Sequence, residues 1–166
     1  MINIFNKIEK LLSANPLSKA SNLMEEEGAK EYFGVNFQVD QLNFKFRNAK
    51  ITPKKVGLFL TLWRRNSENR TEPFKKSDNF DFYIVAVEEN ENHGFFLFPK
   101  NELAKRQILT TNLKEGKRGF RVYPNWIKTE SRQAVNTQIW QSVYFVDLAN
   151  ANYDNTVRIK EILANR

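Results

Sequence analysis

The segment FDFYIVAV at 80–87 constrains the fold of this chain more than any other feature. It is rich in aromatic and β-branched residues and shows little alternation between apolar and polar positions. A strand with one wet face would alternate, so this pattern predicts a central strand that is covered on both faces. A turn at 88–94 and a second apolar strand at 95–98 are predicted to follow.

Alternation with a period of two predicts a hairpin upstream of this strand. Apolar residues occupy every second position over 35–39 and again over 42–46. Lys45 and Arg47 are then expected side by side on the wet face of the second strand. Strands are also predicted at 58–65 and, with a basic and aromatic composition, at 117–123.

Helical patterns occupy much of the remaining chain. They predict an amphipathic helix over 3–13 and a second helix that begins at Ser21. Glu25, Glu26 and Glu27 lie in its first turns, where acids suit the helix dipole. Thr52 and Pro53 predict a single helical turn that ends at Gly57. Further helices are predicted over 101–109, 130–148 and 157–163.

A length of 166 residues suits one domain with its own core. The predicted fold class is α/β (α+β), with a mixed central sheet flanked by helices. Within the single domain 1–166, residues 1–30 are expected to form N-terminal helices, 31–148 the core, and 150–166 a C-terminal helix.

The segment 43–65 carries seven cations and no acid. Apolar residues that need burial lie between them, so the cations are expected on ordered elements and not on a solvated loop. Such an arrangement builds a fixed anion-binding surface, although lysine and arginine also simply solubilise outer faces. The seven cations are Lys45, Arg47, Lys50, Lys54, Lys55, Arg64 and Arg65.

Charge and composition restrict the possible partners. Lys plus Arg is 26 against 19 for Asp plus Glu, which gives a net charge of +7. Polyanions are the natural partners of such a chain. The absence of cysteine excludes disulfides and thiolate chemistry, and one histidine excludes a histidine-rich metal site. No apolar run approaches the roughly 20 residues of a membrane span, so we expect a cytoplasmic protein without a membrane partner.

Five motifs in order resemble those of the MepB-like proteins: AKITPKKVGLFLTLWRR, TEPF, DNFDFYIVAV, GFFLFPK and GKRGFRVYPNW. The resemblance covers roughly 31–148, and Gln138, Trp140 and Gln141 extend it. It implies a small cytosolic bacterial protein whose core looks like that of the PD-(D/E)xK nucleases, a restriction-endonuclease-like fold. Nucleic-acid binding is the role that it favours.

We therefore expect a protein that binds DNA or RNA mainly through phosphates and has no cofactor. Trp126 follows the basic strand and is the aromatic residue most favoured for contact with a base or partner. The expected binding residues are Lys45, Arg47, Lys50, Arg64, Arg65, Lys100, Arg118, Arg121, Tyr123 and Trp126.

Two alternatives stay open. The first is a Mg²⁺-dependent nuclease that uses Glu26, Asp78, Asp81 and Lys100, which stand in the right order. Phe98 occupies the position where a further acid is expected, which weakens such a metal site. Asp81 also has a structural interpretation, as a strand-entry acid bonded to nearby backbone. The second alternative is a protein-interaction module that binds an acidic partner.

Overall fold

A computed structural model describes residues 2–13, 19–150 and 154–166 of the chain. Its largest element is a six-stranded sheet in the order β1-β2-β3-β8-β9-β11. β3 and β8 are parallel, and the other neighbours in this sheet are antiparallel. The strands are β1 (Ser21–Glu25), β2 (Val35–Val39), β3 (Leu42–Asn48), β8 (Phe82–Glu89), β9 (Asn92–Pro99) and β11 (Phe145–Asp147).

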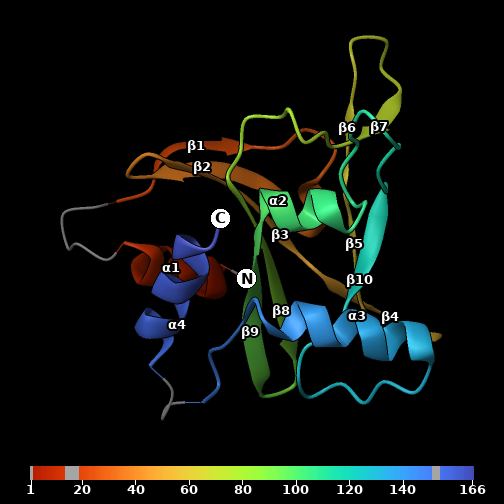
Figure 1. Cartoon of the computed structure of the whole chain (residues 1–166). Helices are drawn as coiled ribbons and strands as arrows, with labels where there is room; N and C mark the ends of the chain where they lie inside the picture. Colours follow the sequence, from red (N-terminus) through yellow and green to blue (C-terminus); the bar gives the residue numbers. More distant parts are fainter. Residues whose placement is uncertain (1, 14–18, 151–153) are drawn as a thin grey trace.

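Helices α1 (Ile2–Leu12) and α4 (Asn155–Ala164) cover one face of this sheet, and Figure 1 shows them packed together. Ile8 of α1 and Ile159 of α4 are buried against the apolar side chains of β2, β3, β8 and β9. The i, i+4 spacing of the apolar positions on α1 supplies the face that this contact requires.

The opposite face carries a second layer. A three-stranded sheet in the order β10-β5-β4 lies there, with α2 and α3 (Figure 1). Its core includes Leu60 of β5, Leu103 of α2 and Val122 of β10. The elements are β4 (Lys50–Thr52), β5 (Lys55–Thr61), β6 (Trp63–Arg65), β7 (Thr71–Pro73), α2 (Lys100–Lys105), β10 (Gly119–Val122) and α3 (Arg132–Ser142), with a 3-10 helix at Lys30–Tyr32.

The two layers confirm the central strand predicted from composition. Residues 82–87 of β8 are all buried, and alternate side chains enter the two apolar cores. The molecule is a mixed α+β domain with a central mixed sheet and helices, as predicted. Among the helices that the structure describes, none is long and apolar enough to cross a membrane.

The helix predicted from Ser21 is wrong. Residues 21–25 form β1, which pairs antiparallel with β2 at the edge of the large sheet. Its sequence SNLME has no strand-like composition, so backbone pairing to β2 decides the outcome over local propensity. The glutamates at 25–27 are therefore not the first turn of a helix.

The helical turn predicted at 52–57 is also wrong. The segment is the tight turn of the β4–β5 hairpin, and Pro53 occupies that turn. Proline fits the second position of a turn as well as the first position of a helix. Gly57 has φ of 84° and lies where the β4–β5 register shifts, so it serves a β-bulge and not a helix end.

Other boundaries also differ from the prediction. The strand predicted at 58–65 is divided into β5 and β6, which belong to different sheets. Helix α3 ends at Ser142, and the apolar residues beyond it form β11 on the edge of the large sheet beside β9. Helix α2 stops at Lys105, short of the predicted 109. The predicted turn at 88–94 is shorter, because β8 and β9 pair as far as Glu89 and Asn92.

Candidate functional site: a basic groove

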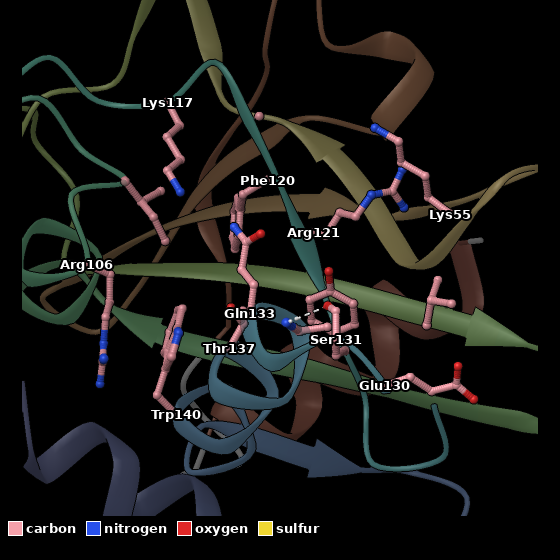
Figure 2. Close-up of a pocket in the computed structure, with 15 residues that line it drawn as sticks. Lys55, Arg106, Lys117, Phe120, Arg121, Glu130, Ser131, Gln133, Thr137 and Trp140 are labelled. Carbon is pink, nitrogen blue, oxygen red and sulfur yellow. Dashed lines mark hydrogen bonds between the residues drawn. The ribbon is translucent and has the colours of Figure 1, made fainter. Parts of the chain in front are cut away.

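A hollow of about 600 Å³ lies between β10, the start of β5 and helix α3. Lys55, Arg106, Lys117 and Arg121 line it, and Glu130 is the only acid among the described residues that do so. In the view of Figure 2, Lys55 and Arg121 lie toward one end of the hollow and Arg106 toward the other. We call this hollow the basic groove.

The two arginines of the basic groove are held by neighbouring groups. Arg121 donates from Nη1 to the backbone oxygen of Gly57 at 3.0 Å and from Nη2 to Thr52 Oγ1 at 2.7 Å. Arg106 donates from Nε to Glu102 Oε1 at 2.7 Å. Arg121 has no acidic partner within the described chain, so its charge is uncompensated there. Both side chains are thus positioned before any ligand arrives.

The two lysines of the groove are different. Lys55 and Lys117 are exposed, and neither ammonium group has a side-chain partner in the part of the chain that the structure describes. Lysine is a compact point charge on a flexible stem, so it can follow an anion over several ångströms. Fixed arginines and free lysines together form a surface that suits phosphate groups.

Gln141 joins helix α3 to the end of β10. Its Nε2 donates to the backbone oxygen of Arg121 at 2.9 Å, and its Oε1 accepts from the backbone N–H of Tyr123 at 2.8 Å. Gln141 is fully buried. Its amide satisfies two backbone groups that β10 leaves without strand partners.

Aromatic rings complete the groove. Tyr123 and Trp140 line it, and the Arg106 guanidinium lies 4.9 Å from the centre of the Trp140 ring. Trp126, the aromatic residue favoured from the sequence, lies outside this lining. It is half-buried against Phe145, and its Nε1 donates to Glu89 Oε2 at 2.9 Å. Tyr123 is thus the one of the two predicted aromatic residues that the structure brings into the groove.

Lys45 and Arg47 are not on a wet face, contrary to the prediction. Both contact Glu26: Lys45 Nζ lies 2.5 Å from Oε1, and Arg47 Nη2 lies 2.7 Å from Oε2. Arg47 is 1% exposed and also donates to the backbone oxygen of Thr61 at 2.5 Å. The second layer covers this face of β3, which alternation along β3 alone does not reveal.

Electrostatics bind this cluster together. Burial raises the pKa of the Glu26 carboxyl, but Lys45 and Arg47 outweigh burial and hold that pKa below its usual range. Burial lowers the pKa of Lys45 despite Glu26. Each oxygen of the Glu26 carboxylate is therefore paired with a cation, and these ion pairs offset the desolvation cost of burying its charge.

Asp78 and Lys100 lie near each other, as the nuclease alternative requires. Lys100 Nζ donates to the backbone oxygen of Asp78 at 3.2 Å. The Asp78 carboxylate, however, accepts from Arg64 Nη1 at 2.9 Å and from the backbone N–H of Lys75 at 2.7 Å. Arg64 also donates to Glu72, so this cluster neutralises itself in part.

The Asp81 carboxylate accepts from the backbone N–H of Asn43 at 2.8 Å. The contact joins the entry of β8 to β3, as expected for a strand-entry acid bonded to nearby backbone. Throughout the described residues, no three acids or histidines gather in a way that could hold a metal ion. Glu26, Asp78 and Asp81 each bond to protein groups instead.

The remaining predicted cations are dispersed. Lys50 on β4 lies 3.8 Å from Glu31, and Arg118 pairs with Glu115 at 2.9 Å. Arg65 lies over the Trp63 ring, on the rim of a separate hollow that also includes Arg64. The binding residues predicted from the sequence do not include Arg106, Lys117 or Trp140, and Lys55 belongs only to the basic segment 43–65. The basic pair that precedes β10, Lys117 and Arg118, was the available signal for Lys117.

Comparisons with known proteins agree with this fold. A family model described as MepB-like matches residues 26–147. The crystal structure of MepB is similar with a TM-score of 0.78 and 32% sequence identity, over 90% of this chain and 99% of that one. A bacterial homing endonuclease structure has a TM-score of 0.46 and 17% identity, over 84% and 86% of the two chains. No curated protein matches the chain.

Proposed function

We propose that this chain, which belongs to the MepB-like family, binds nucleic acid by its phosphates in the basic groove and does not cut it. The proposal rests on two lysines, Lys55 and Lys117, that have no side-chain partner among the described residues and lie beside two held arginines in one hollow. A backbone phosphate offers the charge and the acceptor oxygens that such a set of donors requires.

The cationic surface continues beyond the groove. A second hollow of about 950 Å³ lies beside the end of α2, and the described residues that line it include four lysines and no acid. Lys105 and Arg106 are consecutive in the chain but line different hollows, so α2 ends between the two. A polyanion placed across the end of α2 would contact both hollows, and a nucleic-acid backbone is long enough to do so. The four lysines are Lys75, Lys76, Lys105 and Lys114.

Glu26, Asp78 and Asp81 already bond to protein groups, which supports binding without cleavage. A two-carboxylate metal site needs free oxygens, since hard cations are held by several of them. Glu26 bonds to Lys45 and Arg47, Asp78 to Arg64, and Asp81 to the backbone of β3. Assembly of a magnesium site from these residues would break buried ion pairs.

A salt titration of binding to labelled duplex and single-stranded oligonucleotides tests the proposal. The Lys55→Ala, Lys117→Ala double variant is expected to weaken binding and to lower the slope of log affinity against log salt by about 2, because each phosphate contact contributes about 1. Strands are expected to stay intact on a denaturing gel in the presence of Mg²⁺.

The chain offers a matched control. Lys7 and Lys10 are exposed on α1, which covers the other face of the large sheet. The Lys7→Ala, Lys10→Ala variant loses the same charge, so it is expected to keep the slope of the parent. Equal effects of the two double variants would overturn the groove as the binding site. Absence of oligonucleotide binding at low salt, with retention of an acidic protein instead, would favour the protein-interaction alternative.

A further inference from the structure

The tip of the β4–β5 hairpin exposes apolar side chains among lysines. Ile51 is 57% exposed and Val56 is 55% exposed. Lys50, Lys54 and Lys55 are exposed beside them, and no acid occurs between Asp40 and Glu68 in the sequence. The tip thus presents two β-branched apolar side chains between lysines, a combination of apolar and cationic groups that suits contact with a polyanion.

The hairpin tip is held in place before anything binds. The Arg121 guanidinium joins both sides of it, through Thr52 Oγ1 on β4 and the backbone oxygen of Gly57 on β5. The left-handed backbone of Gly57 forms a bulge where the register shifts, and a bulge turns the adjacent side chain away from the regular strand position. Arg121, a predicted phosphate ligand, thus serves to fix this hairpin.

The tip also adjoins the basic groove. Lys55 and Val56 both line the groove, so a strand whose phosphates lie in the groove passes beside the hairpin. Apolar side chains such as isoleucine, inserted between base pairs from the minor groove, unstack a base step and kink the duplex. The lysines on either side of the tip are then placed for the flanking phosphates.

We propose that the β4–β5 hairpin is a wedge that unstacks one base step of a bound duplex through Ile51 and Val56. This inference rests on the proposed function and adds to it how the hairpin contacts the bound duplex. Charge complementarity selects a polyanion as the occupant over a second copy of the chain, and a duplex is the polyanion that has a base step to unstack. A symmetric contact between two such tips would oppose lysines to lysines, which is unfavourable.

The experiment uses the full chain and a duplex that carries 2-aminopurine at successive positions, with binding followed in parallel by anisotropy. Unstacking raises the fluorescence of 2-aminopurine, and we expect at least a twofold rise at one or two positions. The Ile51→Thr, Val56→Thr variant keeps β-branched side chains at both sites. It is expected to lose at least half of that rise at a protein concentration at which anisotropy shows the duplex to be fully bound.

Leu23→Thr, Met24→Thr is the control, because these residues are 58% and 61% exposed on β1 at the far edge of the large sheet. Its fluorescence response is expected to equal that of the parent. Binding by anisotropy without any fluorescence rise, or an unchanged rise in the hairpin variant, would overturn the wedge and leave phosphate binding standing. A chain that gives no anisotropy change with any oligonucleotide would overturn both proposals.

Discussion

The side chain of Gln141 donates to the backbone oxygen of Arg121 at 2.9 Å, which attaches helix α3 to strand β10 beside the basic groove. The same amide accepts from the Tyr123 N–H. The positions of α3 and β10 beside the groove therefore depend on one buried side chain that is not itself among the residues that line it.

Replacement of Gln141 by leucine is expected to lower the free energy of unfolding by about 2–4 kcal/mol. Leucine has a similar volume but leaves two backbone groups unsatisfied, and each such group costs about 1–3 kcal/mol. Urea unfolding measures the change. Gln133→Leu is the control, because Gln133 is exposed on the same helix, and it is expected to stay within about 0.5 kcal/mol of the parent. An equal loss in both variants would contradict the role of Gln141.

Sequence patterns predicted the central sheet better than they predicted the site. The composition of 80–87 identified β8, because a strand covered twice has no polar positions. Alternation correctly placed Lys45 and Arg47 on one face of β3 but carried no information about what covers that face. The burial of Arg47 depends on Glu26, Thr61 and Trp63, which are 14 to 21 residues distant in the chain.

Arg121 is a second case in which the sequence pattern did not reveal the contacts of a side chain. The basic and aromatic pattern of 117–123 predicted Arg121 as a binding residue, and the structure places it in the lining of the basic groove with two hydrogen bonds to the β4–β5 hairpin. Those bonds depend on a hairpin that the sequence favoured as a helical turn. Proline and glycine are compatible with both structures, and only the pairing of β5 with β10 and β4 decides between them.

Asp81 gives a prediction that separates a structural acid from a metal ligand. Asp81→Ala is expected to lower the free energy of unfolding by about 1–2 kcal/mol, because the Asn43 N–H loses its acceptor. With Mg²⁺, both parent and variant are expected to leave labelled duplex intact on a denaturing gel. Asp147→Ala, which removes an acceptor of the Ala149 N–H, is the control for the loss of a local backbone contact. Magnesium-dependent fragments from the parent alone would contradict this prediction.

Gly57 gives a prediction about the hairpin. Its φ of 84° is left-handed, and a Cβ at this position would meet the Tyr123 ring at 2.6 Å. Gly57→Ala is expected to lower the free energy of unfolding by about 1–3 kcal/mol from backbone strain, with a further loss as the ring shifts. Gly57→Asn brings the same Cβ but tolerates the left-handed region better. Thermal unfolding is expected to show a smaller loss for asparagine, and a larger one would contradict strain as the cause.

Glu26 gives a prediction about pH. Its pKa in the folded state lies below the ordinary 4.5, so the folded protein favours the carboxylate. The contribution of Glu26 to stability is fully present above pH 4.5 and is lost as the pH falls through the lowered pKa. Burial also lowers the pKa of Lys45, and the Glu26 carboxylate opposes this effect because it favours the charged ammonium group.

Glu26→Gln is the variant that isolates this contribution. It is expected to lower the free energy of unfolding at pH 7 by about 3–5 kcal/mol, because Lys45 and Arg47 stay buried without their shared carboxylate. Urea unfolding between pH 7 and pH 3 measures both curves. The difference between parent and variant is expected to shrink as the pH falls below 4.5, since protonation of Glu26 then removes the same ion pairs from the parent. A difference that stays constant over this range would show that Glu26 stabilises the fold by packing and not by its charge.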